Sequence, residues 1–379
     1  MNRNNLTTPC YVIETAKIEE NCKILRSVMD STGAEILLAQ KAFSCYALYP
    51  LIGQYLSGAA SSGLYEAKLA REHFPGESHV YSAAFRPDDF PEIYDYADKM
   101  IFNSIAQLKA YGQEAKNRGI SVGLRVNPEH STQEGSGIYD PCAPGSRLGV
   151  TIAQFDAQID PEMLSLLDGL HFHTLCEQDA QPLLETVAAM EAKFGKYLHE
   201  LTWLNLGGGH HISRAGYELP ALEDCIRHLQ DTYGLKIYLE PGEAIALNAG
   251  VLVTTVLDIV ENSGVQIAIL DTSAACHMPD VIEMPYRPPL MDSGLPQEYA
   301  YTYRLGGPTC LSGDVIGEYG FQKPLKVGDR LTFGDMAIYT MVKNNTFNGM
   351  PLPDIVLEDE NGQCEILRRF DYEDFKGRL

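Results

Sequence analysis

Eight short apolar or β-branched segments, each followed by enough chain for a helix, constrain this sequence more than any other feature. They are Glu35–Ala39, Gly58–Ser61, His79–Ala83, Met100–Asn103, Ser121–Asn127, Gly169–Thr174, Thr202–Leu206 and Lys236–Glu240. The stretch Gln181–Leu198, like others between them, repeats its apolar residues at helical spacing. Strands that alternate with helices form parallel sheets. Eight such units within about 230 residues predict a closed (β/α)8 barrel rather than an open doubly wound sheet.

The last third of the chain has a different pattern and predicts a second domain. Alternating β-branched runs occur there without long helices between them, at Val251–Val260, Val265–Asp271, Arg330–Phe333 and Ala337–Met341. They predict an antiparallel β domain. The opening segment Thr8–Ile13 precedes the first barrel strand by a helix, Ala16–Met29, and either begins the barrel region or pairs with the β domain. We expect an α/β protein with its barrel at 14–244 and its β domain formed by 1–13 and 245–379.

Charge and cysteine content narrow the class of partners. The 379 residues carry a formal net charge of −22, from 29 Lys and Arg against 51 Asp and Glu. This balance disfavours nucleic acid and anionic membranes and favours cationic ligands, although it also simply keeps a cytosolic protein dispersed. Nine scattered cysteines without a Cys-x-x-Cys pair indicate neither a disulfide framework nor a zinc ribbon, and favour the cytoplasm. A polar N-terminus and the lack of a long apolar stretch disfavour secretion and membrane insertion.

One irregular span lies among the barrel units. Pro128–Gly149 is rich in Gly, Pro, Ser and Asp and follows the fifth strand. Loops on that face of a barrel carry function, so this segment is a candidate lid.

Unusual residues stand at the carboxyl ends of several predicted strands, where barrel enzymes keep their active sites. Lys41 follows the first strand, His173 ends the sixth, and Glu240 ends the eighth. A lysine amine desolvated at such a rim loses its proton and attacks a carbonyl, so Lys41 is a candidate Schiff-base lysine. The alternative is an ordinary solvated loop residue.

The glycines Gly207, Gly208 and Gly209 follow the seventh strand and allow backbone amides to approach an anion. Loops after the seventh and eighth strands commonly bind phosphate in barrels. The alternative is a tight strand-to-helix connection. Glu240 ends an apolar strand, where a carboxylate needs a partner, and a protonated pyridine nitrogen would supply one.

His171 and His173 lie one residue apart and therefore face the same side of a strand. Such a pair is also found in zinc hydrolases, but His210 and His211 add no clear ligand spacing. A histidine at a barrel mouth can instead stack on an aromatic ring, and a buried core histidine is the alternative, more so for His171. Lysine, glycine loop, histidine and carboxylate together describe a site for pyridoxal 5′-phosphate (PLP), with no metal.

These residues resemble the alanine racemase-like PLP enzymes that decarboxylate amino acids, which include ornithine/arginine and diaminopimelate decarboxylases. The resemblance covers nearly the whole chain, and its closest form is the carboxynorspermidine (carboxyspermidine) decarboxylase group. Its markers are Ala39-Gln40-Lys41-Ala42, His173-Thr174-Leu175-Cys176-Glu177, Asn205-Leu206-Gly207-Gly208-Gly209, Glu240-Pro241-Gly242-Glu243-Ala244, Gly307-Pro308-Thr309-Cys310-Leu311-Ser312-Gly313-Asp314, Tyr339-Thr340 and Phe347-Asn348-Gly349.

The resemblance implies a PLP-dependent carboxy-lyase that converts carboxynorspermidine to norspermidine, or carboxyspermidine to spermidine, in polyamine biosynthesis. It also implies a homodimer with shared active sites, in which Cys310 and Asp314 come from the neighbouring subunit and the thiol protonates the product. Gly242 and the hydroxyl of Tyr339 would join the three glycines around the phosphate. The alternative for Cys310 is a buried apolar thiol, and Asp280, a suggested substrate contact, is alternatively a turn residue.

One position departs from the relatives. Ornithine and diaminopimelate enzymes usually carry Arg after Glu-Pro-Gly, whereas this chain carries Glu243. An acidic group beside a phosphate is unfavourable unless it faces a cation, so we expect Glu243, Asp280 and Asp314 to select a cationic substrate tail. A diaminopimelate decarboxylase, a metal-dependent hydrolase built on His171 and His173, and a catalytically silent binder of PLP or polyamine remain as alternatives.

Overall fold

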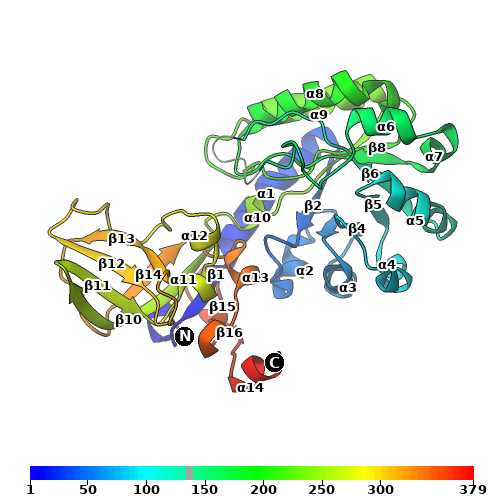
Figure 1. Cartoon of the computed structure of the whole chain (residues 1–379). Helices are drawn as coiled ribbons and strands as arrows, with labels where there is room; N and C mark the ends of the chain where they lie inside the picture. Colours follow the sequence, from blue (N-terminus) through cyan, green and yellow to red (C-terminus); the bar gives the residue numbers. More distant parts are fainter. Residues whose placement is uncertain (134–139) are drawn as a thin grey trace. The chain divides into compact units, whose positions relative to one another are not determined.

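The computed structural model describes residues 1–133 and 140–379. Two compact units divide the chain (Figure 1): Met1–Ile18 with Ala246–Leu379, and Glu19–Ile245. The domain limits expected from the sequence, at 14 and 244, remain a proposal. The candidate lid at 128–149 includes 134–139, which lie outside the described residues.

The second unit is a closed parallel barrel of eight strands in sequential order, which confirms the predicted fold class. Closure comes from β2 pairing with β9 in parallel, Glu35 opposite Tyr238. The strands are β2 (Glu35–Ala39), β3 (Gly58–Ser61), β4 (Glu77–Tyr81), β5 (Lys99–Phe102), β6 (Ser121–Arg125), β7 (Gly169–His171), β8 (Trp203–Asn205) and β9 (Lys236–Leu239).

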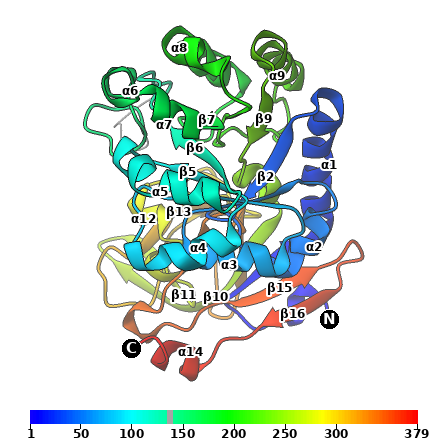
Figure 2. The same cartoon turned by 90° about the vertical axis from the view of Figure 1, so that its right-hand side faces the viewer.

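Helices surround the barrel (Figure 2). They are α1 (Thr15–Thr32, which begins in the other unit), α2 (Tyr49–Ile52), α3 (Leu64–His73), α4 (Phe90–Tyr96), α5 (Ile105–Asn117), α6 (Ile152–Gln158), α7 (Pro161–Leu166), α8 (Ala180–Leu198), α9 (Leu219–Tyr233) and α10 (Glu243–Ala246). Residues at the helix ends explain where two of these helices begin or end. Ser104 accepts a hydrogen bond from the Gln107 N–H at the start of α5, and Gly234, with φ of 72°, ends α9.

The middle of the barrel is filled by side chains. Leu37, Ile101, Trp203 and Tyr238 form a buried cluster. The Trp203 ring occupies the space where Gly123 and Gly169 would carry Cβ atoms, at 2.3 and 2.1 Å. Because this layer is packed, polar groups in the barrel gather at its two ends.

The first unit holds a twisted sheet in the order β13-β12-β11-β10-β1-β15-β16, with β14 paired to β10. Most pairs are antiparallel, as predicted, but β1–β15 and β11–β12 are parallel. Its strands are β1 (Cys10–Glu14), β10 (Gly250–Asn262), β11 (Val265–Leu270), β12 (Tyr301–Gly306), β13 (Val315–Phe321), β14 (Arg330–Gly334), β15 (Asp354–Glu358) and β16 (Cys364–Arg368). The opening segment therefore belongs to this sheet.

Short helices complete this unit: α11 (Ala274–His277), α12 (Asp280–Glu283), α13 (Thr340–Lys343) and α14 (Tyr372–Lys376). The predicted strand at Ala337–Met341 is wrong, because Tyr339 adopts φ of 52°, which breaks an extended run, and α13 begins at the next residue. Within the described part of the chain, no helix is long and apolar enough to cross a membrane.

Candidate active site

A cavity of about 280 Å³ opens among the carboxyl ends of the barrel strands. It is lined by side chains from six strands or the residues just after them, among them Lys41, Tyr81, Arg125, His171, His173 and Glu240. The structure thus brings together the lysine, the histidine and the carboxylate predicted from the strand ends.

Lys41 is held by the residue before it. The Gln40 side chain is fully buried and donates from Nε2 to Ser61 Oγ at 2.8 Å and to the Glu66 carbonyl at 2.9 Å. Tyr49 donates its hydroxyl to Gln40 Oε1 at 2.8 Å. Three hydrogen bonds therefore fix the turn that presents Lys41 to the cavity.

The environment of Lys41 favours its neutral amine. Its surface faces the cavity, and enclosure by protein lowers its pKa, with the positive charge of Arg125 acting in the same direction. Glu240 and Glu243 oppose this shift without reversing it. A lysine that is easily deprotonated is a nucleophile toward a carbonyl carbon.

His173 is held in one orientation. The Gly208 N–H donates to His173 Nδ1 at 2.9 Å, and Arg125 donates to the His173 carbonyl at 2.9 Å. Burial, followed by the charges of Lys41 and Arg125, moves the pKa of His173 well below its usual value. The neutral ring accepts at Nδ1 and carries its proton on Nε2, which lies 3.4 Å from Lys41 Nζ.

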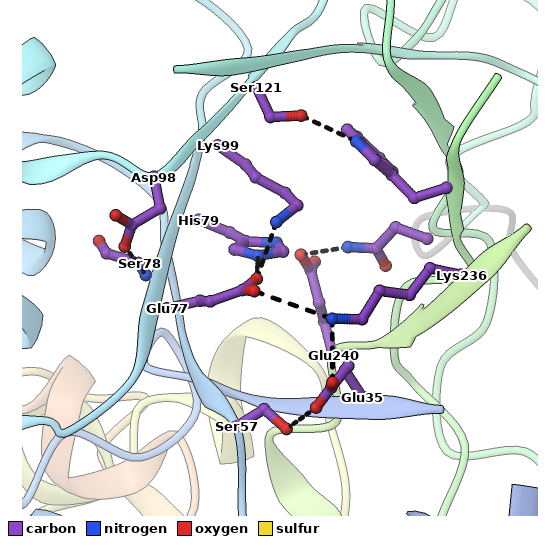
Figure 3. A network of polar contacts seen from close by, with 12 residues as sticks. Glu35, Ser57, Glu77, Ser78, His79, Asp98, Lys99, Ser121, Lys236 and Glu240 are labelled. Carbon is purple, nitrogen blue, oxygen red and sulfur yellow. Dashed lines mark hydrogen bonds and ion pairs between the residues drawn. The ribbon is translucent and has the colours of Figure 1, made fainter. Parts of the chain in front are cut away.

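The Glu240 side chain lies inside the barrel (Figure 3). Asn205 donates to its Oε1 at 2.7 Å, and His171 Nε2 lies 3.3 Å from its Oε2. Burial opposes ionisation, but His171, His79 and Asn205 outweigh burial and lower the pKa of Glu240 to about 2. Because a carboxylate has about four acceptor positions, Glu240 retains capacity for a further donor.

Sequence reasoning missed Arg125, which ends β6. Its side chain is buried in the cavity, with the guanidinium 4.8 Å from the centre of the Tyr81 ring. The signal was the same as for Glu240, because a charged residue ends an apolar strand, Ser121–Arg125. His171 was considered a core histidine; it is buried, and it also contacts Glu240.

The three glycines make close contacts with the neighbouring strand ends. A Cβ on Gly208 would lie 2.1 Å from the Glu240 carbonyl oxygen, and one on Gly209 would lie 1.9 Å from that of Leu175. Two of their amides already have partners, since the Gly207 N–H donates to Asn205 Oδ1 at 2.9 Å and Gly208 binds His173. The three glycines therefore form the tight connection that the sequence analysis gave as the alternative. Binding of a phosphate by this loop stays a prediction.

The loop after β9 repeats this arrangement. A Cβ on Gly242 would lie 2.5 Å from the Ala42 Cβ, beside Lys41. Glu243 begins α10, and its Oε2 lies 2.8 Å from His211 Nε2. The expected acidic residue thus has a histidine partner, which the sequence reasoning had not connected to it.

The remaining predicted site residues lie in the other unit, so their part in the active site stays a prediction. Asp280 is ion-paired with Lys343. Asp314 is buried and accepts from Ser273 Oγ at 2.8 Å and Thr309 Oγ1 at 2.6 Å, which gives it a structural task. Cys310 is exposed rather than a buried thiol, and Tyr339 has the positive φ noted above.

In the described residues, no group of three or more His, Cys, Asp or Glu side chains is arranged to hold a metal ion. Of the two histidines considered for zinc, His171 faces Glu240 and His173 faces Lys41. A barrel with a lysine of lowered pKa at its rim and an ionised carboxylate deep in the same cavity fits the class of PLP-dependent enzymes.

Comparison with known proteins makes this class specific. The family model described as "Pyridoxal-dependent decarboxylase, C-terminal sheet domain" matches residues 10–337. The chain is 41% identical to the carboxynorspermidine/carboxyspermidine decarboxylase of Campylobacter jejuni, with 98% of both chains covered. It is also 41% identical to the carboxyaminopropylagmatine decarboxylase of Synechocystis, covering 99% of this chain and 96% of that one. The chain therefore belongs to the pyridoxal-dependent decarboxylase family.

Solved structures of two decarboxylases are similar to this chain. The crystal structure of the Campylobacter jejuni carboxynorspermidine decarboxylase, complexed with norspermidine, matches with a TM-score of 0.91 and 40% identity over 99% of this chain and all of that one. A diaminopimelate decarboxylase from Helicobacter pylori shares the fold, with a TM-score of 0.82 at 19% identity over 99% of this chain and 98% of that one.

Family membership makes the chain a decarboxylase with PLP as cofactor, so the hydrolase and silent-binder alternatives no longer apply. The cavity fits that cofactor by the chemistry of its side chains. Lys41 offers an amine for the aldehyde, Glu240 a carboxylate for the ring nitrogen, and His173 an imidazole for the ring.

Proposed function

We propose that this decarboxylase acts on carboxylated linear polyamines, carboxynorspermidine and carboxyspermidine, and yields norspermidine and spermidine. The observation that carries the chemistry is the pairing, in one cavity, of Lys41, whose pKa is lowered, with an ionised Glu240. The substrate class is supported by relatives that are 36–41% identical over nearly full length. The net charge of −22 suits a polycationic ligand.

Bound PLP supplies an aldehyde for amines and an aromatic ring that takes up the electron pair left when carbon dioxide departs. Lys41, whose pKa is lowered, would supply the amine that binds the aldehyde. Glu240 would hold a proton at the ring nitrogen, because a carboxylate with its pKa lowered to about 2 stays ionised at neutral pH. His173, fixed by Gly208 and with its pKa well below the usual value, would offer its imidazole to the ring.

A second substrate follows from the equally similar Synechocystis relative. Carboxyaminopropylagmatine ends in a guanidinium group, whereas the carboxylated triamines end in an ammonium group. Both tails are cationic and both would suit an acidic site, so the enzyme chemistry is the same and only the far end of the substrate differs.

Turnover by the purified holoenzyme separates these candidates. The substrates are carboxynorspermidine, carboxyspermidine, carboxyaminopropylagmatine and diaminopimelate, with released carbon dioxide and the polyamine product measured. We expect the highest kcat/KM for one of the two triamines and the lowest for diaminopimelate. Preference for carboxyaminopropylagmatine would reassign the substrate, and preference for diaminopimelate would refute the polyamine proposal.

We further propose a cytoplasmic homodimer with shared sites, in which Cys310, Asp280, Asp314 and Tyr339 complete the active site. Mixing inactive Lys41→Ala chains with inactive Cys310→Ala chains tests this arrangement. In a dimer with shared sites, an equal mixture regains about a quarter of wild-type activity, because half of the dimers are hybrids and each hybrid has one of its two sites intact. No recovery from mixtures shown to exchange subunits would contradict the proposal.

A further inference from the structure

The pair formed by His211 and Glu243 has no role in the chemistry described so far. His211 Nε2 lies 2.8 Å from Glu243 Oε2, and only 9% and 12% of the two side chains are exposed. A carboxylate accepts but does not donate, so the imidazole donates from Nε2. The carboxylate is thereby partnered inside the protein, as a nearly buried charge requires.

This pair joins the two glycine loops at the barrel rim. His211 stands two residues after Gly209, and Glu243 directly follows Gly242. Backbone contacts hold both loops in place: the His211 N–H donates to the Gln178 carbonyl at 3.0 Å, and Ser213 donates its hydroxyl to the Ala244 carbonyl. The side-chain contact is therefore set by the fold at the position proposed for the phosphate.

A cation is needed to balance the negative charges at the proposed phosphate position. A phosphate ester carries about two negative charges near neutral pH, and Glu243 adds another close enough to act on Lys41. Glu243 acts against the lowering of the Lys41 pKa, and His211 helps to lower the pKa of His210. Among the described residues, no hydrogen bond forms at His211 Nδ1.

We propose that His211 is a phosphate-binding residue and that Glu243 positions it and holds it cationic. With a carboxylate on one side and a phosphate on the other, the imidazole keeps both protons. It donates Nε2–H to Glu243 and Nδ1–H to the phosphate. The acidic residue thus supports anion binding through its histidine partner. This inference rests on the PLP site proposed above, and it replaces the substrate-selecting role expected for Glu243.

Cofactor affinity measures this role without substrate. PLP and pyridoxal, which lacks the phosphate, are titrated into the enzyme freed of cofactor, and the absorbance of the bound form is followed. For His211→Leu and for the isosteric Glu243→Gln, we expect PLP affinity to fall about 10- to 100-fold. Pyridoxal affinity stays within about 2-fold, and the ³¹P NMR signal of bound PLP shifts.

A matched control and a rescue sharpen the test. His228 Nε2 lies 2.8 Å from Glu191 Oε1 on the outer helices, so His228→Leu removes a similar pair away from the glycine loops and leaves PLP affinity unchanged. A cation at residue 243 replaces the pair directly, so Glu243→Arg combined with His211→Asn regains most of the PLP affinity.

Two results overturn the proposal. Equal loss of affinity for PLP and pyridoxal in Glu243→Gln assigns the pair a structural role. Unchanged PLP affinity with a raised KM for the polyamine substrate returns Glu243 to substrate selection. If the wild-type holoenzyme releases no carbon dioxide from any carboxylated polyamine, the proposed function fails while the cofactor titrations still decide the role of His211.

Discussion

The two ends of the barrel use the same residue types for opposite purposes. At the carboxyl rim, Lys41 lies beside a neutral His173 and near Arg125, and its pKa falls. At the amino end, Lys99 lies 2.8 Å from Glu77 Oε2 and 4.9 Å from the centre of the Tyr238 ring. A lysine without a close carboxylate loses its proton more easily and can act as a nucleophile. A lysine that contacts a carboxylate and an aromatic face instead stabilises the fold.

Figure 3 shows the amino-end network in full. Glu77 accepts from His79 at 2.8 Å and from Lys99, and it lies 4.0 Å from Lys236. Lys236 in turn pairs with Glu35 at 2.9 Å. The charged side chains of this network are therefore paired with one another and are not available to bind a ligand.

Replacement of the rim lysine has the largest expected effect. Lys41→Ala removes the amine proposed to hold the cofactor, so turnover is expected to fall by at least about 10³-fold and the visible absorbance of the bound cofactor to disappear. Lys99→Met is the control at the other end and keeps both. Retention of absorbance and turnover in Lys41→Ala would contradict the assignment.

Replacement of the rim carboxylate comes next. Glu240→Gln removes the negative charge proposed to hold a proton at the ring nitrogen, so kcat is expected to fall by about 10²-fold or more, while KM changes little. Glu77→Gln makes the same chemical change at the amino end and is expected to keep kcat within about 2-fold. Similar losses in both variants, measured by steady-state kinetics, would remove the functional difference between the two ends.

The amino end should instead control stability. Lys99→Met leaves Glu77 without its closest cation and is expected to lower the free energy of unfolding by about 1–2 kcal/mol. Lys236 is 44% exposed, so Lys236→Met should cost about 0.5 kcal/mol or less. Urea unfolding of both variants measures the difference, and a larger loss for Lys236→Met would reverse this ranking.

A smaller effect depends on pH. The hydrogen bond from His79 and the charge of Lys99 lower the pKa of Glu77 against the effect of burial. A carboxyl whose pKa is lower in the folded state stabilises the protein above its unfolded value and loses that contribution as pH falls toward the folded value. Below about pH 4, the urea midpoint of the wild type should therefore fall more steeply than that of Glu77→Gln. Parallel midpoints would show that Glu77 is not responsible.

The sequence predicted those features that depend on position along a strand. Lys41, His173 and Glu240 were found because charged or polar residues end apolar strands, and Arg125 carried the same signal but was overlooked. The pairing of His211 with Glu243 could not be predicted, because the two residues lie in different loops and only the fold brings them together. The predicted strand at Ala337–Met341 failed because an alternating pattern does not reveal the positive φ of Tyr339.

The sheet of the first unit unites both ends of the chain. Val12 of β1 pairs with Val251 of β10 on one side and with Val356 of β15 on the other. During synthesis from the N-terminus, β1 is made before both of these neighbours, and the whole barrel segment, Glu19–Ile245, separates it from them in the sequence. The apolar strand Cys10–Glu14 therefore gains its two sheet partners only after the barrel segment has been made.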